Sequence, residues 1–214
     1  MTKPLVTFML LLGWATAPFS AENPAPVLLV LGDSLSAAYG IDLKDGWVAL
    51  LEDRLREQGY PYRVTNASIS GETTSGGRRR LPALLASHQP QLVLIELGAN
   101  DGLRGVSLSE IDKNFVSMLQ DIANSDATAI VVRMQLPPNY GPAYTQGFNS
   151  IYDKLAHAAP GLTLAPFFLS EVILEPALMQ PDGLHPTAAA QPRMLDAVWP
   201  SLQRHLLQTP ARQP

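Results

Sequence analysis

The chain has 214 residues, of which 46% are hydrophobic and 16% charged, and its formal net charge is −4. This acidic balance argues against a nucleic-acid partner, because proteins that bind nucleic acids normally present a basic surface. Cysteine is absent, which excludes disulfides and metal sites built from thiolates.

The first residues have the pattern of an export signal. Lys3 precedes an apolar run, Leu5–Trp14, and a polar stretch begins at Glu22. A charged start, a short apolar segment and small residues are typical of a secretory signal peptide. We therefore predict a signal peptide over residues 1–21, followed by a single domain over residues 22–214. The apolar run is shorter than the ~20 residues of a transmembrane helix, so no stable membrane span is expected after cleavage. An uncleaved anchor is the alternative.

Five short apolar runs follow, and their centres lie about thirty to forty residues apart, as repeated strand–helix–strand units require. They are Val27–Leu31, Tyr62–Thr65, Leu92–Leu97, Ala129–Met134 and Leu162–Ala165. Three of them, the first, third and fourth, are nearly continuous rather than alternating. Continuous apolar runs are typical of parallel strands that are covered on both faces.

The segments between these runs carry helical periodicity. Gly59 is placed to end the first helix, Ser109 and Asp112 resemble a capping box, and Pro200 is expected to kink the last helix. We interpret the aromatic and methionine residues on the apolar helix faces as core. The pattern predicts an α/β fold, a three-layer α/β/α sandwich with a central five-stranded parallel sheet. Such sheets place their sites in the loops after the carboxyl ends of the strands.

Three of these predicted loops carry groups suited to acyl transfer. Ser34, in GDSLS, offers a hydroxyl nucleophile directly after the first strand. Gly71 follows the second strand, where the lack of a Cβ lets a substrate oxygen approach the backbone N–H. Asn100 follows the third strand and offers a neutral amide donor for an oxyanion. A capping serine and a turn asparagine are the structural alternatives.

The stretch PDGLHP, after the fifth strand, adds an acid and a base. His185 lies in this loop, whereas the three other histidines, at positions 88, 157 and 205, lie in helical patterns. Asp182, three residues earlier, can accept a hydrogen bond from Nδ1 and leave Nε2 free to take the serine proton. A polar turn is the alternative for this stretch alone, and the joint pattern at four strand ends favours catalysis.

A phosphate-binding loop is a weaker interpretation of one segment. The stretch GETTSGGR, residues 71–78, has glycines at the separation of that motif. However, Gly77 stands where the motif requires lysine, and Arg78 stands where it requires serine or threonine. Without the lysine and the hydroxyl, the nucleotide reading loses its chemical basis.

Four blocks, GDSLS, SISGETT, GANDG and DGLHP, closely resemble those of the GDSL-type, or SGNH, hydrolases. Their order and spacing look most like the bacterial thioesterase I, lysophospholipase L1 and arylesterase branch of that family. The resemblance implies the flavodoxin-like SGNH fold, with Ser34 as nucleophile and with Asp182 and His185 as the rest of a triad. It also implies an oxyanion hole from Ser34, Gly71 and Asn100, with no metal and no organic cofactor. Relatives in this branch are typically periplasmic or exported, which agrees with the predicted signal peptide.

The resemblance also implies the substrate class: carboxylic esters and acyl thioesters, including aryl or short-to-medium acyl esters, acyl-CoA and lysophospholipids. We expect the acyl chain to lie over Leu103, Leu136, Pro137 and Tyr140, and a monomer as the working form. A rigid proline turn is the alternative for the LPPNYG segment. Ala99 departs from the branch, which often has a second glycine there. A carbohydrate acetylesterase with the same triad, or a non-catalytic binding domain, is the rival function.

Overall fold

The computed structural model describes residues 25–159 and 161–206. Its centre is a parallel sheet of five strands in the order β2-β1-β3-β4-β5, as predicted. The strands are β1 (Val27–Gly32), β2 (Arg63–Asn66), β3 (Leu92–Glu96), β4 (Thr128–Val132) and β5 (Thr163–Ala165). The predicted signal peptide lies outside the described residues. Within the described part of the chain, no helix combines the length and the apolar character needed to cross a bilayer.

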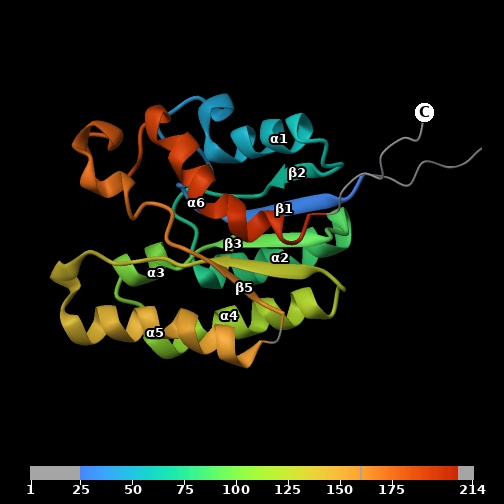
Figure 1. The fold of residues 1–214 in the computed structure, drawn as a ribbon. Helices are drawn as coiled ribbons and strands as arrows, with labels where there is room; N and C mark the ends of the chain where they lie inside the picture. Colours follow the sequence, from blue (N-terminus) through green and yellow to red (C-terminus); the bar gives the residue numbers. More distant parts are fainter. Residues whose placement is uncertain (1–24, 160, 207–214) are drawn as a thin grey trace, which may run out of the picture.

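Helices cover both faces of the sheet, which confirms the three-layer architecture (Figure 1). α1 and α6 lie on one face, and α2, α4 and α5 lie on the other. The helices are α1 (Trp47–Glu57), α2 (Thr74–His88), α3 (Ala99–Leu103), α4 (Leu108–Ala123), α5 (Pro142–Ala158) and α6 (Gln191–Gln203). Because both faces are covered, β1 and β3 are buried along their whole length, and their sequences are accordingly apolar nearly throughout.

The helix ends follow local chemistry, in one case differently from the prediction. α1 ends as predicted at Gly59, whose φ is +75°. Its N–H and that of Tyr60 donate to the carbonyls of Arg56 and Leu55, which closes the last turn. The predicted capping box of Ser109 and Asp112 is wrong, because α4 begins two residues earlier. Its N-cap is Ser107, whose hydroxyl accepts from the N–H of Glu110.

Short turns fill the loops at the carboxyl edge of the sheet. They are the 3₁₀ turns η1 (Leu43–Asp45), η2 (Pro138–Tyr140), η3 (Val172–Leu174), η4 (Pro176–Leu178) and η5 (Ala188–Ala190). α3, η2 and the segment that contains η3 and η4 gather at the left of the sheet in Figure 1. All strands run in the same direction, so residues that follow β1, β3, β4 and β5 meet at this edge.

Candidate active site

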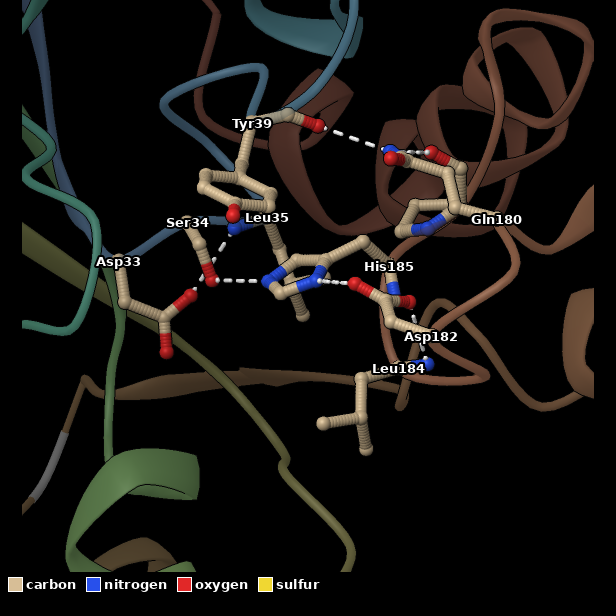
Figure 2. A network of polar contacts seen from close by, with 9 residues as sticks. Asp33, Ser34, Leu35, Tyr39, Gln180, Asp182, Leu184 and His185 are labelled. Atoms are coloured by element: carbon tan, nitrogen blue, oxygen red, sulfur yellow. Dashed lines mark hydrogen bonds and ion pairs between the residues drawn. The ribbon is translucent and has the colours of Figure 1, made fainter.

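Ser34, His185 and Asp182 form a continuous hydrogen-bonded chain (Figure 2). His185 Nε2 lies 2.9 Å from Ser34 Oγ, and His185 Nδ1 lies 2.6 Å from Asp182 Oδ2. With the ring hydrogen on Nδ1, Asp182 accepts it, and Nε2 is left to accept the serine hydrogen. The three side chains therefore stand in the order that acyl transfer by a serine requires.

The PDGLHP loop is a tight turn, and the turn is what sets the acid beside the base. Gly183 donates its N–H to the carbonyl of Gln180, and its own φ is +67°. Asp182 Oδ1 accepts from the backbone N–H groups of Leu184 and His185 at 2.9 and 3.0 Å. These bonds hold the carboxylate in place and, with His185, lower the pKa of Asp182 to about 2. The residue is therefore an anion throughout the neutral range.

Contacts from the β1 loop fix the His185 ring and join the two halves of the site. The ring of Tyr39 packs against that of His185, with centroids 4.4 Å apart. The amide nitrogen of Gln180 donates to the carbonyls of Tyr39 and Pro186 at 2.8 and 2.9 Å. Gly40, with φ +75°, leaves the room in which this amide lies, because a Cβ there would overlap it.

Asn100 lies in the first turn of α3 and is oriented by Asp33, the neighbour of Ser34. Its Nδ2 donates to Asp33 Oδ2 at 2.8 Å. An amide nitrogen carries two hydrogens, so the second remains for the cavity that Asn100 lines together with Ser34. Gly98 takes the positive φ of this segment, +109°, so Asn100 is not the positive-φ turn residue of the structural alternative.

Gly71 occupies a turn beside the loop that contains Ser34. The N–H of Glu72 donates to the carbonyl of Ile69, and the φ of Gly71 is +79°, a value at which L side chains are strained. The N–H of Ile69 donates to the carbonyl of Gly32, which brings this turn next to the end of β1. The guanidinium of Arg104 donates to the carbonyl of Gly71 at 3.0 Å. Gly71 is not among the residues that line the cavity.

A buried polar cluster links the segments that carry Gly71 and Asn100. Asp101 accepts from the backbone N–H and the hydroxyl of Thr74, at 2.8 and 2.6 Å. The hydroxyl of Thr74 in turn accepts from the amide of Asn114 at 3.0 Å. Burial raises the pKa of Asp101, and the bonds from Thr74 oppose that shift. The cluster ties the start of α2 to α3 and α4.

A second pair of acids, Asp33 and Glu96, lies buried where β1 and β3 end. Glu96 Oε2 accepts from Ser36 Oγ at 2.7 Å and from the N–H of Asp33 at 3.2 Å. Burial raises the pKa of Asp33 to about 6, and burial together with the charge of Asp33 raises the pKa of Glu96 well above its usual range. Sequence reasoning missed this pair, although Glu96 is the one charged residue of an otherwise apolar strand.

An apolar cavity of about 440 Å³ opens beside Ser34 and His185. Of the residues predicted to contact the acyl chain, Leu103, Leu136 and Pro137 line it, and Ala99 does too. Tyr140 does not line it, and its hydroxyl donates instead to the carbonyl of Leu103 at 3.0 Å. Sequence reasoning missed the apolar residues that the last loops contribute, which are Met134, Phe167, Leu169, Ile173, Met179 and Leu184.

The other histidines lie away from this cavity, as expected. His88 ends α2 and His157 lies in α5, while His205 Nε2 contacts Thr163 Oγ1 at 2.7 Å. In the ranges that the structure describes, no three His, Asp or Glu side chains form a group that could hold a metal ion. The phosphate-loop reading gains no support, because Arg78 and Arg79 are exposed on α2 and Arg80 pairs with Glu72 at 2.9 Å.

Comparison with known proteins gives one consistent family. The model of the GDSL-like Lipase/Acylhydrolase family matches residues 30–192. The chain is 52% identical to Esterase TesA of Pseudomonas aeruginosa, over 85% of this chain and 90% of the relative. It is 45% identical to thioesterase 1/protease 1/lysophospholipase L1 of Escherichia coli K12, over 84% of each chain.

A solved structure shares the fold. The psychrotrophic esterase EstA from a Pseudoalteromonas species, in a structure inhibited by monoethylphosphonate, superposes with a TM-score of 0.80. The two chains are 40% identical, and the match covers 83% of this chain and 97% of the other. The predicted SGNH-type fold is therefore confirmed.

Proposed function

Because this chain belongs to the GDSL-like lipase/acylhydrolase family and is an ester and thioester hydrolase of it, we propose that it acts through a Ser34–His185–Asp182 triad. The observation that carries the proposal is the hydrogen-bonded chain from Ser34 Oγ through the His185 ring to Asp182, at 2.9 and 2.6 Å. Ser34, at one end of this hydrogen-bonded series, lines a cavity that can hold an acyl group.

Acylation begins when His185 Nε2 takes the proton of Ser34 and the serine oxygen attacks the carbonyl carbon. Asp182 holds the ring in the required tautomer and stabilises the imidazolium. His185 then donates its proton to the leaving alcohol or thiol, and an acyl-enzyme remains on Ser34. In deacylation His185 takes a proton from water as the water oxygen attacks the ester carbonyl. It then returns this proton to Ser34 Oγ as the acyl–serine bond breaks and the acid leaves.

The oxyanion that forms in each step is assigned to three donors: the backbone N–H groups of Ser34 and Gly71 and the amide of Asn100. The bond from Asn100 to Asp33 supports this role, because it fixes the amide before the substrate arrives. Removal of one such donor typically costs about 3–4 kcal/mol of transition-state stabilisation.

The cavity supports an acyl chain longer than acetyl as the preferred substrate group. Its lining combines Leu103 of α3 with apolar residues from the loops after β4 and β5, among them Leu136 and Pro137. Each methylene of the acyl chain that is buried in the cavity contributes about 0.8 kcal/mol to the free energy of binding. The names of the relatives, which include esterase, thioesterase and lysophospholipase, agree with acyl substrates. A carbohydrate acetylesterase would leave most of this apolar surface unused.

The site of action is proposed to be the periplasm, with a monomer as the working form. The proposal relies on the predicted signal peptide over residues 1–21, which precedes the predicted single domain over residues 22–214. Mass spectrometry of the protein from a periplasmic extract tests it. A mature chain that begins near residue 22 is expected, and a full-length chain retained in the membrane would contradict it.

The test of the function compares wild type with Ser34→Ala on p-nitrophenyl esters, acyl-CoA thioesters, lysophospholipids and an acetylated polysaccharide. We expect turnover of medium-chain esters and thioesters by wild type, and a loss to background in Ser34→Ala. A phosphonate ester should label wild type and leave Ser34→Ala unlabelled, with circular dichroism to confirm the fold. Ser75→Ala, at a half-buried position in the first turn of α2, is the matched control. Turnover by folded Ser34→Ala would overturn the triad.

A further inference from the structure

The mechanism above leaves one buried group without a function, the side chain of Glu96. It ends β3 and is fully buried, and its Oε2 accepts from the backbone N–H of Asp33 at 3.2 Å. Asp33 is itself 1% exposed. A carboxyl group is costly to bury, and two in contact are more so. The pair therefore needs a physical reason to stand directly under the nucleophile loop.

The donors around the two acids show where a proton must lie. Asp33 accepts from the N–H of Leu35 at 3.0 Å and from the amide of Asn100 at 2.8 Å. Glu96 Oε2 accepts two further hydrogen bonds, whereas Glu96 Oε1 is buried and has no donor. Two carboxyl groups in contact cannot both be ionised, so they share one proton. The oxygen without a donor marks Glu96 as the neutral partner and Asp33 as the anion.

We propose that Glu96 is a positioning residue for the oxyanion site: as a neutral acid it donates to Asp33 and so holds the Asp33 carboxylate against the amide of Asn100. The inference rests on the proposed function, since it assigns Asn100 to the oxyanion. Glu96 touches neither the substrate nor Ser34 Oγ, and it acts through two successive hydrogen bonds.

The physical reason is preorganisation. Donors that point at the developing charge lower the barrier most when they need not reorient during the reaction. Asp33 has two acceptor oxygens, and one is taken by the N–H of Leu35. The proposed bond from Glu96 would hold the Asp33 carboxylate at a third position, in addition to the bonds from Leu35 and Asn100. Asp33 Oδ2 would then stay in line with Asn100 Nδ2. If Glu96 ionised, the same contact would repel Asp33 and release the amide.

The first experiment compares Glu96→Gln and Glu96→Leu with wild type. Glutamine keeps a neutral donor toward Asp33, while leucine keeps similar bulk and removes the hydrogen bonds. We expect Glu96→Leu to lower kcat by about 10- to 10²-fold, somewhat less than the loss of a whole oxyanion donor, with KM within about twofold. Glu96→Gln should recover most of that kcat. Glu57→Gln, exposed at the end of α1, is the matched control.

A double-mutant cycle with Asn100→Ala tests whether Glu96 acts through Asn100. If it does, Glu96→Leu should lower kcat little further in the Asn100→Ala background, so the two changes are not additive. Additive losses in kcat would overturn the inference, and so would a folded Glu96→Leu enzyme with wild-type kcat. Asn100→Ala with wild-type kcat would overturn both the oxyanion role and this inference. A reduced kcat for Asn100→Ala beside a normal kcat for Glu96→Leu would overturn the inference alone.

Two readouts remain if the leucine variant does not fold. In the infrared spectrum at neutral pH, the carbonyl stretch of a protonated carboxylic acid should be present in wild type and in Glu57→Gln, and absent in Glu96→Gln. As the pH rises, kcat of wild type should fall when Glu96 loses its proton, whereas Glu96→Gln should keep its plateau. The same alkaline profile in both enzymes, or the same infrared band, would overturn the inference.

Discussion

Replacement of Thr74 by valine removes a buried hydroxyl while it preserves the shape of the side chain. The hydroxyl donates to Asp101 at 2.6 Å and accepts from Asn114 at 3.0 Å, and Thr74 is fully buried. A hydrogen bond to a charged group contributes about 1.5–3 kcal/mol, and a buried donor left without a partner costs about 1–3 kcal/mol. We therefore expect Thr74→Val to lower the free energy of unfolding by about 2–5 kcal/mol, slightly less than the sum of the two terms, about 2.5–6 kcal/mol, because contributions within one hydrogen-bond network are not additive.

The change should also affect catalysis, because Thr74 joins the segment after Gly71 to the helix that carries Asn100. A small displacement between Gly71 and Asn100, two of the three proposed oxyanion donors, is expected to lower kcat by about tenfold or more, with KM nearly unchanged. The donors interact most strongly with charge that develops only in the transition state.

Urea unfolding monitored by circular dichroism measures the first effect, and steady-state kinetics on one medium-chain ester measures the second. At about 2–4 °C per kcal/mol, the melting temperature should fall by about 4–20 °C. The control is Thr145→Val in α5, where the half-buried hydroxyl donates to Gly141 and water can replace the bond. A loss below about 1 kcal/mol in Thr74→Val, or a loss equal to that of Thr145→Val, would refute the reasoning.

Further changes address the triad, the cavity and the acid pair. Asp182→Asn presents an N–H to His185 Nδ1 and favours the wrong tautomer of the ring, so kcat should fall by about 10²–10³-fold. This loss is smaller than the ~10⁴-fold loss in a serine protease, because the Asp182 carboxylate is partly exposed. An unchanged kcat would contradict the proposed role of Asp182. Leu136→Trp should lower kcat/KM for longer acyl chains by about fourfold per excluded methylene and should leave kcat/KM for acetyl esters unchanged. An unaltered chain-length profile would show that Leu136 does not contact the acyl chain. The folded state raises the pKa of Asp33 to about 6 and holds the pKa of Glu96 well above its usual range. The stability that these acids contribute is therefore complete at low pH and declines as the pH rises through these pKa values. Denaturation of wild type and Glu96→Gln across this range should show a steeper decline in wild type, and parallel curves would count against the raised pKa values.

The fold was predictable because its signals are local and repeated. Continuous apolar runs specified the parallel strands, and Gly59 specified a helix end that needs a positive φ. The capping serine of α4 was harder, since Ser107 and Ser109 both precede acidic residues at the right spacing. The choice depends on which turn of the helix packs on its neighbours, and that is a tertiary property.

The juxtaposition of Ser34, Asp182 and His185 was predictable for a different reason. Each of these residues lies in a loop that follows a strand, and parallel strands bring such loops to one edge whatever their separation in the chain. No such rule predicts the pairing of Asp33 with Glu96, because that pairing depends on the register of β1 against β3. No such rule predicts the hydrogen bonds between Thr74 and Asp101 either. In the sequence, Glu96 has the pattern of a polar residue at the end of a strand. Only the packed structure shows that its side chain is fully buried.

The proposed nucleophile and base come from distant parts of the chain, so assembly of the site requires both halves of the chain. Ser34 and His185 are 151 residues apart, and the loop that holds His185 is followed by α6, which bonds to α1 through Gln191 and Trp47 at 3.0 Å. A chain divided in the exposed turn at residues 124–126 would place Ser34, the proposed nucleophile, in one fragment together with Gly71 and Asn100. Asp182 and His185 would lie in the other fragment. Neither fragment contains a complete set of reacting groups, so ester turnover by a mixture of the two would be a direct reporter of their reassembly.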